Sequence, residues 1–259
     1  GGLGWLRRKY GASVDSVKSV EIVTADGQIR IASATQNPDL FWAVRGAGNN
    51  FGVVTRFEFE LHPVGPIVYG AVPFFAISDA PAVLEGFRSF TKSSPDEISA
   101  ILMYYWIPPG PPFPEALWGQ PAITVPTIYS GDPKDGERLL EPVRHFAKPI
   151  FDLSGQFPFT VLQSMLDGGF PEGWLYYWKS TYVNELSAEL LETVMDLGAN
   201  RPTPMTGLGL WQLGGAFGRV PEDAMAFANR SSPFLVTIEA TWQDPADSER
   251  CIAWARGAW

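Results

Sequence analysis

A glycine-rich loop placed directly before an alternating strand is the feature that most constrains the fold of this chain. The segment from Asp39 to Pro63 reads DLFWAVRGAGNNFGVVTRFEFELHP and contains Gly46, Gly48 and Gly52. Glycine loses more conformational freedom on folding than any other residue, so a cluster of them needs a reason. A tight turn explains most such clusters, but bare backbone N–H groups also let an anionic or planar ligand approach closely.

The G-x-G pattern of this loop does not predict a Rossmann nicotinamide site. That fingerprint has a strand before the glycines and a helix after them, so that the pyrophosphate meets the helix N-terminus. Here the order is reversed, because residues 38–42 predict a helical turn and VVTRFEFEL predicts a strand. In that strand Phe57, Phe59 and Leu61 alternate with glutamates, so we expect it to be half-buried.

The first residues of the chain, GGLGWLRRKYG, form a second glycine-rich segment. The two segments flank a hairpin predicted over residues 19–33, with its reversal at Asp26-Gly27. This arrangement predicts that both segments converge on one extended ligand. For Arg7, Arg8 and Lys9 we expect a solvated basic turn.

A domain boundary is predicted within HPVGP at residues 62–66, since its prolines stop strand pairing. Strands are expected at 67–75, 99–107, 122–129, 175–183, 207–213 and 234–242, and helices at 80–91, 134–147, 159–166, 188–197, 222–228 and 245–259. With no repeat and no regular crossover pattern, the chain reads as an α+β fold with a largely antiparallel sheet.

Composition excludes several classes of partner. The chain has 19 basic and 28 acidic residues, so no basic stripe is available for nucleic acid. One cysteine and two distant histidines predict neither a disulfide nor a zinc site. No apolar stretch approaches the roughly 18 residues of a membrane span, so we expect a soluble chain with no membrane partner. The ends, which lack an initial methionine and stop within a predicted helix, lead us to expect a fragment. Compartment and oligomeric state are left open.

Several segments together resemble the FAD-linked oxidases of the berberine bridge enzyme-like type, in the superfamily of vanillyl-alcohol oxidase and p-cresol methylhydroxylase (PCMH). They are GGLGWLRRKYG with Asp15, SVEIVTADG, NPDLFWAVRGAGNNFGVVTRFEFELHPVGP, YYWKSTYVNELS and GGAFGRVPEDAMAF. The resemblance covers nearly the whole chain and is most specific over residues 37–63, although Ala47 and Asn49 interrupt the family's glycine run. It implies that residues 1–64 are the second part of a PCMH-type FAD-binding domain. Residues 65–259 would then be a substrate-binding domain, incomplete at its C-terminus, with a largely antiparallel sheet flanked by helices.

The resemblance also implies which residues contact FAD, mainly through the backbone. They are Gly1, Gly2, Gly4, Gly11, Asp15, Gly46, Gly48, Asn50, Phe51, Gly52 and Val53. The histidine and cysteine that bond covalently to flavin in such enzymes have no counterpart in His62, His145 or Cys251. A closing segment that often supplies a tyrosine would follow Trp259. The resemblance therefore implies an internal piece that lacks both ends.

In such enzymes the sheet of the substrate domain roofs the flavin. Within residues 234–242 we expect one apolar set to pack on helices, formed by Val236, Ile238, Ala240 and Trp242, and the alternate residues to face the other way. The candidate substrate residues are Glu239, Thr237, Gln212 and Lys179. Six aromatic residues are expected either to line the substrate site or to belong to the hydrophobic core: Tyr104, Tyr105, Trp106, Tyr176, Tyr177 and Trp178.

The implied reaction is hydride transfer from an alcohol, sugar or amine C–H bond to FAD, followed by reoxidation with dioxygen. The sequence identifies no catalytic base, and Glu239 is the one residue considered for that role. Two alternatives stay open at this point. One is a non-catalytic module that binds a carbohydrate or another small molecule, which an aromatic content of 14% favours. The other is an inactive fragment. The paired glycine segments favour the oxidoreductase, because a binding module has no need of them.

Overall fold

The computed structural model describes residues 2–259, which form two compact units. Unit 1 contains residues 2–64 together with Leu213–Ser232. Unit 2 contains Gly65–Gln212 and Pro233–Trp259. The first division thus falls within the proline-containing segment where the sequence predicts a boundary. Residues 213–232, which the sequence analysis places in the second domain, belong to unit 1.

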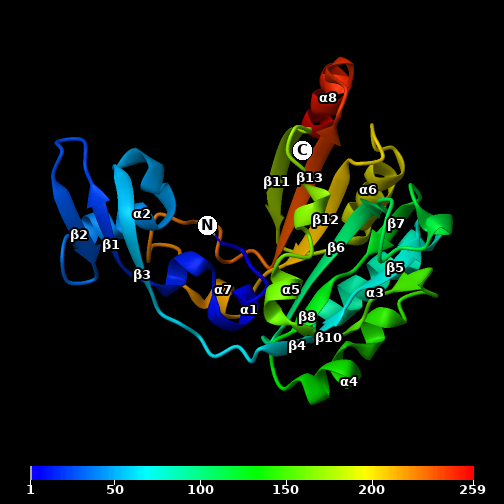
Figure 1. The fold of residues 1–259 in the computed structure, drawn as a ribbon, viewed down its shortest axis with the longest axis horizontal. Coiled ribbons are helices and arrows are strands. Elements are labelled where there is room, and N and C mark those ends of the chain that lie inside the picture. The colour runs from blue at the N-terminus through cyan, green and yellow to red at the C-terminus, as the bar shows by residue number, and fades with distance from the viewer. Residues whose placement is uncertain (1) are drawn as a thin grey trace. The chain divides into compact units, whose positions relative to one another are not determined.

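Unit 1 is built on a three-stranded antiparallel sheet in the order β2-β1-β3 (Figure 1). Its strands are β1 (Val17–Val23), β2 (Ile29–Ser33) and β3 (Val53–Phe59). The predicted hairpin is confirmed, because Val23 pairs with Ile29 across a turn in which Gly27 has φ of 75°. The other elements are α1 (Arg7–Tyr10), η1 (Ser13–Ser16), α2 (Pro38–Ala47), η2 (Gly48–Asn50) and α7 (Ala216–Arg219).

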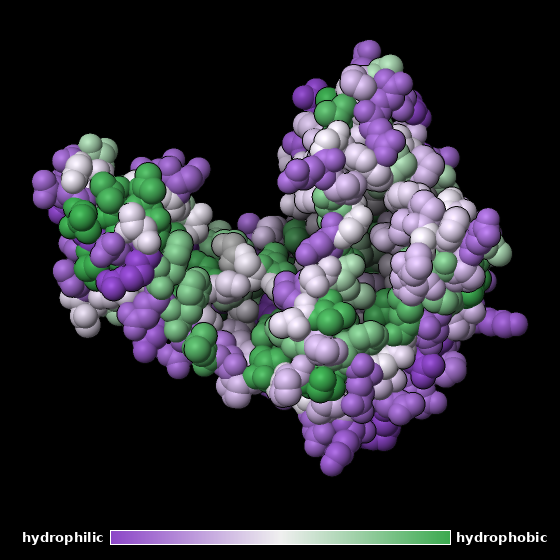
Figure 2. Space-filling model, viewed as in Figure 1, coloured by the Kyte–Doolittle hydropathy of each residue, from purple (hydrophilic) through white to green (hydrophobic). Residues whose placement is uncertain are grey.

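Strand β3 is more exposed than the sequence predicts. Phe57, Phe59 and Leu61 are 55%, 43% and 87% exposed, and Figure 2 shows hydrophobic residues gathered on the surface of this sheet. Helix α2 packs on β1 and β2, where it covers Val20 and Ala32, and from β3 it is Val54 that packs against this cluster. The expectation of a half-buried strand is therefore wrong, because alternation shows that one face is apolar but not that another element covers it.

The basic turn Arg7-Arg8 is buried and not solvated. The exposed fractions of Arg7 and Arg8 are 1% and 8%, because residues 213–232 pack against α1. The Arg7 guanidinium donates to the Gly4 carbonyl at 3.1 Å, and Arg8 donates to the carbonyl of Leu213. Burial, together with the neighbouring charge of Arg8, lowers the pKa of Arg7 to about 9.

Unit 2 is organised around a ten-stranded sheet whose main path runs β10-β4-β8-β6-β12-β13-β11 (Figure 1). All pairings between its described strands are antiparallel, so the predicted sheet type is confirmed. The strands are β4 (Ile67–Ala71), β5 (Pro73–Ala76), β6 (Ile98–Trp106), β7 (Pro121–Thr124), β8 (Thr127–Tyr129), β9 (Phe151–Asp152), β10 (Gly155–Pro158), β11 (Leu175–Val183), β12 (Gly207–Gln212) and β13 (Phe234–Trp242). The expected strands at 67–75 and 122–129 are each divided in two. Pro126, between β7 and β8, has no N–H to give to a ladder.

Four longer helices cover one face of this sheet and form the main core with it. They are α3 (Ala80–Thr91), α4 (Pro133–Arg144), α6 (Ala188–Ala199) and α8 (Ser248–Ala258). The apolar set of β13 (Val236, Ile238, Ala240, Trp242) belongs to this core, as predicted. Shorter helical turns are η3 (Ile77–Asp79), η4 (Glu115–Leu117), α5 (Phe159–Gln163), η5 (Asp167–Gly169) and η6 (Pro245–Asp247). No helix within residues 2–259 is long and apolar enough to cross a membrane.

The helix predicted at residues 222–228 does not form. Its backbone groups bond instead to α2, where Trp42 Nε1 donates to the Asp223 carbonyl at 2.7 Å and the Ala226 N–H donates to the Trp42 carbonyl at 3.2 Å. The Glu222 carboxylate accepts from the backbone N–H of Arg230 at 3.0 Å. Tertiary hydrogen bonds have therefore replaced the helical ladder that the local sequence favours.

Candidate functional site

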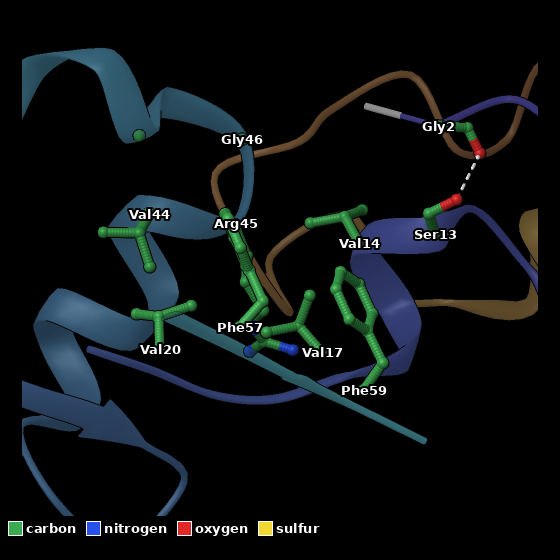
Figure 3. Close-up of a pocket in the computed structure, with 11 residues that line it drawn as sticks. Gly2, Ser13, Val14, Val17, Val20, Val44, Arg45, Gly46, Phe57 and Phe59 are labelled. Atoms are coloured by element: carbon green, nitrogen blue, oxygen red, sulfur yellow. Dashed lines mark hydrogen bonds between the residues drawn. The ribbon is translucent and has the colours of Figure 1, made fainter. Parts of the chain in front are cut away.

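Both glycine segments border one hollow in unit 1 (Figure 3). Gly2 comes from the first segment, and Gly46 and Gly48 from the second. The exposed rings of Phe57 and Phe59, on β3, form part of its wall, and the volume is about 340 Å³. Ser13 fixes the first segment beside the hollow, since its hydroxyl donates to the Gly2 carbonyl at 3.4 Å (Figure 3). The two segments thus lie at a common cavity.

Packing explains some of these glycines without any ligand. At Gly46, with φ of 150°, an added Cβ would lie 2.1 Å from the Ala226 carbonyl oxygen. At Gly52, with φ of 147°, it would lie 2.1 Å from the Val23 carbonyl oxygen. Close approach of another backbone segment is therefore sufficient reason for glycine at both positions.

Gly48 has no such explanation. An added Cβ there would meet only Val44, at 4.0 Å, and the residue has ordinary helical dihedral angles. Yet Gly48 lines the hollow. A side chain at this position would occupy space that the protein itself leaves open, which is the behaviour expected of a glycine that admits a ligand.

Arg45 brings positive charge to the same hollow, and the sequence analysis did not single it out. Its Nε donates to the Phe41 carbonyl at 3.3 Å and its Nη2 to the Ala224 carbonyl at 3.1 Å, while the guanidinium carbon lies 4.1 Å from the centre of the Phe41 ring. Among residues 2–259 no carboxylate forms an ion pair with it, and partial burial lowers its pKa. The signal for this residue is its place directly before Gly46.

Asp15, a predicted cofactor contact, holds unit 1 together. Its carboxylate accepts from Arg230 Nη1 at 2.9 Å, from Arg230 Nη2 at 2.6 Å and from the Ala12 N–H at 2.8 Å. Gly11 lies beside it, where an added Cβ would be 2.5 Å from the Asp15 carboxylate. Both residues therefore have a structural reason to be present, whether or not a cofactor binds.

The remaining predicted cofactor residues lie outside the wall of the hollow. Gly1 is outside the described residues. The other residues of this group are Gly4, Asn50, Phe51, Gly52 and Val53. An added Cβ at Gly4 would meet nothing within 4 Å, the Asn50 amide donates to the Ala47 carbonyl at 3.4 Å, and Phe51 and Val53 are exposed. Of the predicted set, the hollow thus brings together Gly2, Gly46 and Gly48.

Two of the candidate substrate residues, Glu239 and Thr237, lie on the face of the unit 2 sheet opposite the four covering helices. Directly paired residues of antiparallel strands share a face, and Glu239 pairs with Gly207 and Thr237 with Gly209. Continuing across the sheet, Gly209 pairs with Met103. Because glycines stand at two of these positions, the face is hollowed next to Glu239.

Glu239 lines a small cavity on that face with Trp106 and Phe170. Its side chain is only 8% exposed, and burial raises the pKa of its carboxyl although a hydrogen bond with the Thr237 hydroxyl opposes this effect. A carboxyl with a raised pKa in a cleft is a typical proton acceptor and donor. The Thr237 hydroxyl also accepts from Trp211 Nε1 at 3.2 Å.

Gln212 and Lys179 lie elsewhere in unit 2. The Gln212 amide donates to the Thr91 carbonyl at 3.2 Å and to the Ser94 hydroxyl at 2.6 Å. Lys179 pairs with the core residue Ile238, which places it on the helix-covered face, and its ammonium lies 4.3 Å from the ring centre of Trp259. Neither residue lines the cavity at Glu239.

The expected aromatic residues divide between core and surface. Tyr104 is fully buried in the main core, whereas Tyr176 and Trp178 are 37% and 50% exposed. Tyr105 and Trp106 line cavities on the Glu239 face, and Tyr177 accepts from the Arg256 guanidinium at 3.2 Å.

The two histidines and the cysteine lie apart from both cavities. His62 stacks on Tyr10 with ring centres 4.2 Å apart and bonds the Ser16 hydroxyl at 2.8 Å. Cys251 is buried in the core, and His145 is exposed near Glu141. Within the described part of the chain, no group of three or more His, Cys, Asp or Glu side chains is placed to hold a metal ion.

Comparison with known proteins gives relatives along the whole chain. It is 29% identical over 257 residues to an FAD-linked oxidoreductase of Dictyostelium discoideum, covering 98% of this chain and 54% of that protein. It is 27% identical over 214 residues to the xylooligosaccharide oxidase of Thermothelomyces thermophilus, covering 76% of this chain and 39% of the relative. No family model matches it.

Among solved structures, the berberine bridge enzyme-like protein 1 of Physcomitrella patens superposes with a TM-score of 0.84 at 22% identity, covering 100% of this chain and 57% of that one. The chain thus spans about half the length of these proteins. The comparisons confirm the fold class and the resemblance that the sequence motifs indicate.

Proposed function

We propose that this chain is part of an FAD-dependent oxidase. It is a relative of the FAD-linked oxidoreductases and has the berberine bridge enzyme-like fold. The observation that supports this most is the hollow of unit 1, where both glycine segments, an arginine without an ion-pair partner and two exposed aromatic rings meet. A dinucleotide needs all three kinds of group, because it carries phosphates as well as flat rings.

The residues present fit such a cofactor. The N–H groups of the glycine segments and Arg45 would hold phosphate oxygens, and the rings of Phe57 and Phe59 would cover an apolar ring. At about 340 Å³ the hollow would take part of the dinucleotide. Bound FAD would supply the acceptor for the two electrons and the hydrogen lost from an alcohol, sugar or amine carbon, and dioxygen would carry them away as hydrogen peroxide.

Substrate would bind in unit 2, on the sheet face that carries Glu239. In its ionised form, the Glu239 carboxylate would take the proton that leaves the substrate hydroxyl or amine as the C–H bond breaks. The aromatic surroundings keep water away from this carboxyl and raise its pKa, so it accepts the proton more strongly than an exposed glutamate. Thr237 would orient the carboxylate through its hydroxyl.

The test is a titration of the purified chain with FAD, followed by the change in flavin fluorescence. Gly48→Ala should fold normally, since its Cβ would meet only Val44 at 4.0 Å, but it should weaken FAD binding by at least about tenfold. Gly257→Ala makes the same change on α8, where an added Cβ meets nothing within 4 Å, and should leave the affinity unchanged. Equal FAD affinity in both variants would contradict the assignment of the hollow.

A further inference from the structure

A larger cavity lies on the same sheet face of unit 2, beside the small cavity at Glu239. Its volume is about 530 Å³, which is within the range of small-molecule sites. Phe74 and Tyr105 line the sheet side, Phe113 belongs to the segment after β6, and Leu162 and Met165 come from α5 and the turn after it. Tyr105 and Leu166 also line the cavity at Glu239, so the two spaces adjoin.

Few polar groups in the larger cavity are free to bind a ligand. The Thr124 hydroxyl donates to the Pro73 carbonyl at 3.0 Å, and the Ser164 hydroxyl donates to the Thr160 carbonyl at 3.1 Å. The Tyr105 hydroxyl is different: burial raises its pKa, and no hydrogen bond within residues 2–259 contributes to that shift. Tyr105 therefore presents a hydroxyl group within a mostly apolar wall whose other two hydroxyls, on Thr124 and Ser164, donate to backbone carbonyls.

From this arrangement we propose that the paired cavities bind a planar aromatic compound carrying a hydroxyl group, with its rings among Phe74, Phe113 and Met165 and its hydroxyl at Tyr105. The inference rests on the proposed function, since it names the substrate class of that oxidation site. Aromatic rings suit this wall because Phe and Met side chains make favourable edge and sulfur contacts with them. A sugar does not suit it, because most of its hydroxyl groups would be buried without partners.

The experiment measures binding of three probes to the full chain by equilibrium dialysis: 2-naphthol, naphthalene and xylobiose. We expect 2-naphthol to bind more tightly than naphthalene, and xylobiose not to compete. Tyr105→Phe should weaken the binding of 2-naphthol by roughly three- to tenfold, which corresponds to the loss of one hydrogen bond, and leave the affinity for naphthalene unchanged. That difference separates a ligand contact from a general loss of structure.

A second variant tests the apolar part. Met165→Trp should fill part of the cavity and weaken the binding of both 2-naphthol and naphthalene by about tenfold or more. Ile150→Trp, at a 36% exposed site of the same unit outside the cavity, should leave both affinities unchanged. Xylobiose displacing 2-naphthol, or Tyr105→Phe affecting both aromatic probes equally, would overturn the proposal. FAD is titrated on the same preparations. Uptake of FAD without aromatic binding would refute only this inference, and aromatic binding without FAD uptake would refute only the proposed function.

Discussion

Replacing Asp15 with asparagine should destabilise unit 1 strongly, although the change is isosteric. Asp15 and Arg230 form a bidentate pair whose side chains are 10% and 1% exposed. The substitution leaves the Arg230 charge buried without a counterion. Breaking a buried ion pair by removing one partner destabilises a protein by roughly 3–5 kcal/mol.

The lower end of that range applies here, since Arg230 keeps other contacts. Its guanidinium lies 4.8 Å and 4.7 Å from the ring centres of Phe217 and Phe227 and donates to the Phe227 carbonyl at 3.4 Å. We therefore expect a loss of about 3 kcal/mol, which for a chain of this size lowers the melting temperature by roughly 6–12 °C.

Hydrogen exchange by mass spectrometry, with a thermal melt beside it, checks this result. Peptides from residues 213–232 should exchange faster in Asp15→Asn, and those of the unit 2 core should not. Asp26→Asn is the matched control, because Asp26 also pairs with an arginine at 2.6 Å but is exposed, and it should leave melting nearly unchanged. A double variant Asp15→Asn/Arg230→Met should recover part of the loss. A melting temperature for Asp15→Asn equal to that of Asp26→Asn would refute the reasoning.

Three further outcomes are expected. Burial raises the pKa of Glu239 above its ordinary 4.5, so the stability of the native protein falls as pH rises through that raised value. Glu239→Gln should abolish this fall in the free energy of unfolding, measured by denaturant titration. A parallel pH dependence in both proteins would contradict this prediction. Ser187→Ala should destabilise by about 1 kcal/mol, because the Ser187 hydroxyl accepts from the Leu190 N–H at 3.2 Å and caps α6; an unchanged urea midpoint would contradict this. Gly46→Ala should destabilise by more than about 1 kcal/mol through its clash with Ala226, and a thermal melt like that of the wild type would show that the loop can move.

Local patterns in the sequence were sufficient to predict most strands and helices of unit 2. The alternation in β13 correctly assigned its core face, because Val236 and Ile238 lie against the helices. What failed depended on contacts between distant segments. The segment at 222–228 has helix-forming residues but bonds to α2, and the burial of Arg7 comes from residues about 200 positions further along the chain.

The site could be predicted only in part for the same reason. The pattern of glycines located the hollow, yet it could not separate Gly46, which packing explains, from Gly48, which packing does not. Strand register separates the substrate candidates, since it puts Glu239 and Lys179 on opposite faces of the sheet. Register follows from turns and tertiary packing, which a single sequence does not contain.

The most direct test of the central claim is hydrogen exchange of the chain with and without saturating FAD. If the hollow binds FAD, we expect protection in two stretches of unit 1, near residues 2–17 and 44–59, which line it. Protection there that is lost in Gly48→Ala and kept in Gly257→Ala would support the cofactor site. No protection at either stretch, or protection confined to unit 2, would contradict it.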